Sequence, residues 1–150
     1  MTITVTGDKA LARKLNKLGI KMGKAIDDGV FITAQGVRTD AIKSIQNKSP
    51  GRVVQRSRQG GGGTYSHVAS NEGQAPNTDT GKLVASIAVE KQSEASYLVG
   101  SNLQYASWLE FGTSKTGARP WLEPAMRSNI KELNKNINKA ADLTIQKASK

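Results

Sequence analysis

Residues 105–126 read YASWLEFGTSKTGARPWLEPAM, and this stretch decides the expected fold. Tyr105, Trp108 and Leu109 stand at the i, i+3 and i+4 spacing at which side chains share one face of a helix. Gly112 follows at the point where a helix C-terminus prefers a residue with a positive φ. The stretch therefore predicts a short helix that ends near Gly112 and is followed by a turn.

The second half of the stretch predicts the start of another helix. Pro120 and Pro124 mark this start, because proline is tolerated in the first helical turn, where its missing N–H would have no partner. Apolar residues then recur every three or four positions, with lysines on the opposite face, which predicts one long helix that runs almost to the C-terminus. These apolar residues are Leu122, Met126, Ile130, Leu133, Ile137, Ala141 and Ile145.

Four aromatic side chains of the stretch are expected to pack in the core rather than against a ligand, because they lie at helical spacing around one turn. They are Tyr105, Trp108, Phe111 and Trp121. We expect Trp121 to be buried where a β-hairpin meets the C-terminal helix. Gly112, Pro120 and Pro124 would fix the chain direction at a rigid corner.

Upstream of the stretch, two short runs of β-prone residues predict that hairpin. The runs are Ser86–Val89 and Tyr97–Gly100, and the polar residues 90–96 separate them. The two strands would form a small antiparallel sheet.

The N-terminal third of the chain predicts a strand followed by a long helix. Residues 2–6 alternate Thr with Ile or Val, which is the period of a half-buried strand, and Asp8 is a candidate N-cap. From Leu11 to Ile45 apolar residues recur every three or four positions, and the lysines fall mostly off that stripe. Because glycines interrupt the helix and destabilise it, we expect a bend or split near Gly29, giving one kinked helix or two collinear helices.

Residues 47–80 are expected to form an extended, flexible, Gly-rich basic loop, because Ser, Gly, Asn, Gln and Pro predominate there. Three arginines, Arg52, Arg56 and Arg58, lead into the glycines of 60–63. Their guanidinium groups are candidates for sequence-independent contact with the phosphates of DNA. A plain solvated loop is the other interpretation of this segment.

The composition limits both the core and the chemistry. Of the 150 residues 37% are hydrophobic and only 5% aromatic, so we expect a thin, mainly aliphatic core and favour an oligomer over an autonomous monomer. The absence of cysteine excludes disulfides, thiolate zinc clusters and thiol nucleophiles. The sequence has no secretory start and no apolar stretch of the roughly 20 residues that span a membrane, so cytosol-like conditions and no membrane partner are expected.

The charge of the chain is strongly positive. Its 22 Lys and Arg against 12 Asp and Glu give a formal net charge of +10. Such an excess favours nucleic acid or an acidic protein surface as a partner. Lysines that keep solvated helix faces soluble are the alternative interpretation.

Residues for catalysis or cofactor binding are not indicated. The single histidine, His67, lies in the Gly-rich segment without a partner at a catalytic spacing. Glu110 and Asp79 lack a second carboxylate or a metal-ligand set at a telling spacing. The glycines of 60–63 lack the Lys-Ser/Thr pair of a phosphate-binding loop. We therefore expect a protein that is not an enzyme and has no catalytic residue, metal or cofactor.

Residues 105–113 and 118–126 together resemble the signature of a tail-component family of long-tailed bacteriophages: Tyr-Ala, aromatic or aliphatic residues, Glu-Phe-Gly-Thr, then Ala-Arg-Pro-Phe-Leu and Pro-Ala. The matching residues of this chain include Tyr105, Trp108, Glu110, Phe111, Gly112, Arg119, Pro120, Trp121 and Pro124. Upstream, Ala75-Pro76 and the run 80–87 resemble the family's Pro, Thr-Gly-x-Leu and Ser-Ile element. The chain departs from the pattern at Trp121, where Phe is usual, and in a longer segment over 50–73.

The resemblance implies an α+β protein, and the length of 150 residues predicts a single domain over 1–150. The residue patterns predict that it consists of a long N-terminal helix, a small antiparallel sheet with a hairpin, a long C-terminal helix and the extended Gly-rich basic loop. The resemblance further implies a virion protein at the head-to-tail junction: a neck, connector or tail-completion subunit that forms a homo-oligomeric ring around the DNA passage and is assembled in the host cytoplasm.

The partners that follow from this role are a head-closure or adaptor protein, a tail-terminator or tail-tube protein, and genomic DNA through non-specific contact. A free, non-sequence-specific nucleic-acid-binding protein is the alternative. Such a protein would bind DNA as an isolated subunit at physiological salt, whereas a connector would bind its protein neighbours far better.

Overall fold

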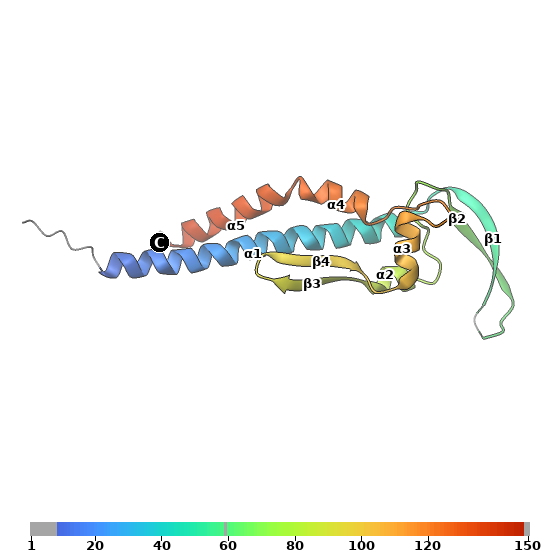
Figure 1. The fold of residues 1–150 in the computed structure, drawn as a ribbon, viewed down its shortest axis with the longest axis horizontal. Helices are drawn as coiled ribbons and strands as arrows, with labels where there is room; N and C mark the ends of the chain where they lie inside the picture. The colour runs from blue at the N-terminus through green and yellow to red at the C-terminus, as the bar shows by residue number, and fades with distance from the viewer. Residues whose placement is uncertain (1–8, 59, 149–150) are drawn as a thin grey trace, which may run out of the picture.

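The computed structural model describes residues 9–58 and 60–148, so the strand expected at 2–6 and the cap expected at Asp8 lie outside the described residues. The chain has the expected α+β fold (Figure 1). Its elements are α1 (Lys9–Gln46), β1 (Gly51–Ser57), β2 (Thr64–Ser70), α2 (Lys82–Ser86), β3 (Ile87–Ser93), β4 (Ser96–Ser101), α3 (Gln104–Phe111), α4 (Glu123–Ile130) and α5 (Leu133–Ala148).

The long helix α1 is the axis of the molecule. The helices α4 and α5 lie along one side of it and the β3–β4 hairpin along another, while β1–β2 projects beyond its C-terminal end (Figure 1). Of the two alternatives expected near Gly29, the split into two helices is wrong, because α1 is one continuous helix of 38 residues. A Cβ atom at Gly29 would lie 2.7 Å from the Cα of Ile137, so this glycine lets α5 approach α1 closely.

The expected C-terminal helix is present but divided, because α4 and α5 are separate helices. Between them the N–H of Glu132 donates to the carbonyl of Asn129, three residues back rather than four, at 3.0 Å. The side-chain amide of Asn129 donates to the carboxylate of Asp40 in α1 at 2.7 Å. This contact ties the turn to α1 and lets α5 run back along it.

The predicted hairpin is confirmed as β3–β4, with longer strands than expected. Their antiparallel pairing runs from Ile87↔Ser101 to Ser93↔Ser96, so a tight turn replaces the expected polar linker. Ala95 in this turn has a φ of 53°, which is rare for a residue other than glycine. Its N–H donates to the carboxylate of Asp27 in α1 at 2.9 Å, so α1 holds the turn in place.

The segment expected to be an irregular loop contains a second hairpin, β1–β2, and that expectation is corrected. The strands pair antiparallel over their whole length, with Val53 opposite Val68, and the glycines of 60–63 form the turn. Alternation of side chains over 51–57 and 64–70 is the period that favours strands, and the arginines and glycines obscured it. The two hairpins are separate two-stranded sheets rather than one sheet. The mobility of β1–β2 in the free subunit stays a prediction.

The core lies where the C-terminal half of α1 meets α2, β3, α3 and α4. It is small and mainly aliphatic, as expected. Its buried members are Val37, Ala41, Ile45, Leu83, Ile87, Ala106, Trp121 and Ala125. The N-terminal half of α1 and the β1–β2 hairpin extend away from this core at opposite ends of the molecule (Figure 1).

Candidate functional site

The signature residues form a corner between α3 and α4, at the edge of the core. Gly112 ends α3 with φ 77° and ψ −176°, a conformation that is essentially restricted to glycine. A Cβ atom there would lie 2.8 Å from the N of Ala118 and 2.9 Å from the O of Thr116. The positive φ expected at Gly112 is thus confirmed, and both the backbone conformation and the close neighbours exclude a larger residue.

Glu110 holds the two sides of the corner together. Its side chain is buried, and its carboxylate accepts the backbone N–H groups of Trp121 at 2.8 Å, Leu122 at 3.0 Å and Glu123 at 2.8 Å. The first N–H groups of a helix have no partner within the helix and carry partial positive charge. Glu110 on α3 therefore caps α4, with hydrogen bonds strengthened by its charge. The sequence indicates Glu110 as part of a motif but not as a cap, because the carboxylate accepts N–H groups that lie 11 to 13 residues further along the chain and such a contact has no local signal.

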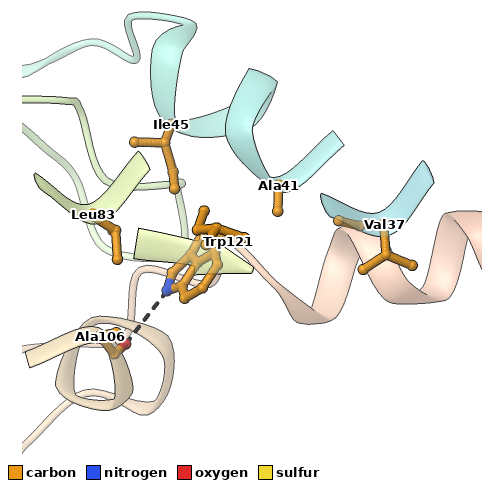
Figure 2. Packing of buried hydrophobic residues seen from close by; sticks show 8 residues of the cluster. Val37, Ala41, Ile45, Leu83, Ala106 and Trp121 are labelled. Carbon is orange, nitrogen blue, oxygen red and sulfur yellow. Dashed lines mark hydrogen bonds between the residues drawn. The ribbon is translucent and has the colours of Figure 1, made fainter. Parts of the chain in front are cut away.

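Trp121 packs on the inner side of the corner, against the core. It is 2% exposed, and its indole N–H donates to the carbonyl of Ala106 at 3.4 Å. Figure 2 shows the ring among Ile45, Leu83 and Ala106, which come from α1, α2 and α3. The expected burial of Trp121 is confirmed, and Ile87 of β3 belongs to the same cluster.

Arg119 connects the corner to the β1–β2 hairpin. Its Nε donates to the carbonyl of Ser70 at the end of β2 at 3.0 Å. Its backbone N–H donates to the carbonyl of Leu109 in α3 at 2.6 Å. Nearby, the N–H of Gly73 donates to the carbonyl of Ala118 at 2.8 Å. The signature arginine thus fixes the base of the projecting hairpin against α3.

Two signature aromatics lie on the surface, which corrects the expectation that all four pack in the core. Trp108 is 52% and Phe111 79% exposed, while Tyr105 is half-buried. Ala106 and Glu110, four residues apart, form the buried face of α3, so Trp108 and Phe111 fall on the opposite face. Helical spacing predicted a shared face but did not show which face is buried. Exposed aromatic side chains of this size commonly mark contact with another molecule.

The three arginines proposed for DNA contact lie along β1 and just after it, and all are exposed. Arg56 is not free, since its guanidinium lies 3.3 Å from a carboxylate oxygen of Asp79. The hydroxyl of Tyr65 donates to Asp79 at 2.7 Å, and this hydrogen bond, together with partial burial, raises the pKa of Tyr65. Asp79 therefore ties the hairpin to the segment before α2. His67 also lies beside Asp79, with 3.7 Å between its Nδ1 and the carboxylate.

The described residues contain no group of three or more side chains that could hold a metal ion. In the same part of the chain, no helix is both long and apolar enough to span a membrane. The fold and the corner define the class of protein: a small α+β protein in which a buried corner between α3 and α4 carries two exposed aromatic side chains, Trp108 and Phe111.

The chain belongs to the family described as "Bacteriophage HK97-gp10, putative tail-component", whose model matches residues 9–112. This match confirms the resemblance seen in the sequence and covers its first half, up to Gly112. Membership supports a structural role in a phage tail, as a component of the virion, rather than catalysis. Neither a curated protein nor a solved structure shows a significant match to the chain.

Proposed function

We propose that the protein is a structural subunit of the bacteriophage head-to-tail junction, a neck, connector or tail-completion protein that joins the tail to a DNA-filled head. The observation that supports this proposal most is that some signature residues are buried and others are exposed. Glu110 and Trp121 build a rigid joint, while Trp108 and Phe111 remain on its surface. A joint of this kind holds an aromatic contact surface in a fixed direction, which a subunit of a symmetric assembly requires.

The proposed assembly is a homo-oligomeric ring. On another part of the same subunit, an apolar hollow of about 330 Å³ lies between α1, β4 and α4. Leu98, Met126 and Ile130 line it, and each is more than half exposed. We place Trp108 and Phe111 of the next copy in this hollow. Contacts between two different faces of identical subunits close into a ring when the rotation permits.

The neighbours in this proposal are a head-closure or adaptor protein on one side and a tail-terminator or tail-tube protein on the other. The ring requires no catalysis, cofactor or metal. The purified subunit is expected to be monomeric or weakly associated and to form the closed ring on a template, because the hollow and the aromatic pair offer a small contact area. Mass photometry of the free protein and of disassembled virions measures both states.

The test uses phage that carry Trp108→Ser together with Phe111→Ser. Both side chains are exposed, so the subunit is expected to fold, and electron microscopy of lysates should show filled heads and separate tails. The control is Gln104→Ser, an exposed change on the same helix, which should leave joining intact. Normal numbers of joined, infectious particles with the double variant would contradict the proposed role.

A free nucleic-acid-binding protein is the second candidate, and the net charge of +10 favours it. The two functions make opposite predictions for the same double variant. A free DNA binder would tolerate the loss of Trp108 and Phe111 in particle assembly, whereas a ring subunit would not. The phage experiment therefore separates them.

A further inference from the structure

The positive charge of the protein is concentrated on one helical arm. Residues 9–24, the N-terminal half of α1, contain five Lys, one Arg and no Asp or Glu, so they hold +6 of the net +10. These cations are Lys9, Arg13, Lys14, Lys17, Lys21 and Lys24. All six are exposed, and none lies within ion-pair distance of a carboxylate among the described residues.

The six cations share one face of the arm. At 3.6 residues per turn they fall within about 140° of the helix circumference and extend over about 22 Å of its length. Most apolar residues of the arm lie on the opposite face, where Leu18 and Met22 are half-buried and α5 packs, while the exposed Ile20 lies among the cations. In Figure 1 this part of α1 runs past the turn between β3 and β4, and among the described elements only α5 lies along it. The cationic face is therefore open to solvent over its whole length.

Several cations elsewhere in the protein form contacts that hold the fold. Arg56 pairs with Asp79, Lys91 with Asp27, and Arg119 donates to a main-chain carbonyl. The Nζ of Lys91 lies 2.7 Å from its carboxylate partner, and this hydrogen bond raises the pKa of Lys91. The arm differs from these sites because its charge is unopposed and continuous. The arm is therefore a better candidate for binding a polyanion than the β1–β2 hairpin is.

We propose that this cationic face of α1 binds the phosphate backbone of double-stranded DNA without reading its sequence. Duplex DNA presents one negative charge per about 1.7 Å of its axis, so a straight row of cations can neutralise several phosphates at once and release their counterions. Five of the six cations are lysines, which are depleted at protein–protein interfaces, so an acidic protein is the poorer fit. A lipid surface is the alternative polyanion, because Leu11, Leu15 and Ile20 of the arm are more than half exposed, and the vesicles in the test below address it.

This binding site goes beyond the proposed role in the virion and does not depend on it. Its test measures binding of the full chain to a fluorescent 30-base-pair duplex, of about 100 Å, over a series of salt concentrations, by anisotropy. Two variants each lose three positive charges. The arm variant combines Arg13→Gln, Lys17→Gln and Lys21→Gln. The control variant combines Arg52→Gln, Arg58→Gln and Lys115→Gln.

The arm variant is expected to bind the duplex about tenfold more weakly or worse and to lose about 2 to 3 from the slope of log K against log salt. The control variant should stay within about threefold of the parent, since its charges are distributed outside the arm. Circular dichroism checks that both variants remain folded. Equal losses in the two variants would show that only net charge matters and would overturn the proposal. Vesicles with phosphatidylglycerol that bind the parent when the duplex does not would overturn it as well.

Discussion

The two hairpins of this protein have similar lengths and opposite surroundings. The β3–β4 hairpin lies along α1 and places Ile87 in the core, whereas β1–β2 projects beyond the end of α1 and contributes no side chain to the core cluster (Figure 1). Each is tied to the body by one carboxylate, Asp27 for β3–β4 and Asp79 for β1–β2. Only β3–β4 also contributes an apolar side chain to the core. We therefore expect β3–β4 to unfold together with the core and β1–β2 to open separately.

The largest effect on the free energy of unfolding is expected at the corner between α3 and α4, which contacts both hairpins. Trp121 packs in the cluster that contains Ile87 of β3, and the neighbouring Arg119 holds the end of β2. Trp121→Ala removes a nearly fully buried ring and should lower the free energy of unfolding by about 3 to 5 kcal/mol, enough to unfold a marginal domain. Urea denaturation followed by circular dichroism measures the change.

Trp108→Ala is the matched control for this prediction. It also truncates a tryptophan, but Trp108 is 52% exposed, so the free energy of unfolding should change by no more than about 0.5 kcal/mol. Similar losses of stability in the two variants would show that burial at the corner is not what stabilises the joint.

The difference between the hairpins also explains how far the sequence could predict the fold. In 87–89 and in 97–99 the two outer residues are buried or half-buried and the middle residue is exposed, so the period of a half-buried strand is visible in the sequence of β3–β4. Over 51–57 only Val54 is half-buried, and over 64–70 the alternate half-buried positions include the polar Tyr65 and His67, so the alternation of hydrophobic residues is weak. That hairpin is held by polar contacts from Arg119 and Asp79, whose partners are distant in sequence.

The candidate site was predictable to a similar degree. The need for glycine at Gly112 and the burial of Trp121 follow from local rules about turns and large apolar side chains. The capping of α4 by Glu110 does not, because it joins residues on two different helices across a turn. The role of Gly29 could not be predicted for the same reason: the cost of a glycine within the helix is a local effect, but the close approach of Gly29 to Ile137 of α5 is tertiary.

A smaller effect is expected at the anchor of β3–β4, and it should depend on pH. Hydrogen bonds to Asp27, first from Lys91 and then from the N–H of Ala95, lower the pKa of this carboxyl below its ordinary value. A lowered folded pKa stabilises the protein above the unfolded pKa of about 3.9, and this contribution is lost as pH falls through the folded value. Asp27→Asn should therefore destabilise the protein at pH 7 and less so near pH 3.

Asp28→Asn is the matched control, since Asp28 is the adjacent, exposed carboxylate of α1 and has no hydrogen bond or ion pair among the described residues. Urea denaturation of both variants at the two pH values gives the comparison. A destabilisation by Asp27→Asn that is the same at both pH values would show that charge at this anchor is unimportant.

The smallest effect on global stability is expected at the anchor of β1–β2. Asp79→Ala removes the acceptor for Tyr65 and the partner of Arg56. Exposed ion pairs contribute little to global stability, so the denaturation midpoint should hardly change. Hydrogen exchange at the amides of 51–57 and 64–70 should become faster, because the hairpin opens without the core. Unchanged exchange in these strands would show that the contacts of Asp79 do not hold the hairpin.

Titration of the tyrosines separates the two anchors within one experiment. The hydrogen bond to Asp79 is the largest cause of the raised pKa of Tyr65, so in Asp79→Ala this phenol should ionise at lower pH, nearer its ordinary value. Burial raises the pKa of Tyr97 first and its hydrogen bond to Asp27 second, so Tyr97 should be unaffected by Asp79→Ala and lowered by Asp27→Asn. Ultraviolet absorbance of the phenolates records both. If either variant shifted both tyrosines together, the hairpins would be coupled through the body, and the independence inferred for β1–β2 would be wrong.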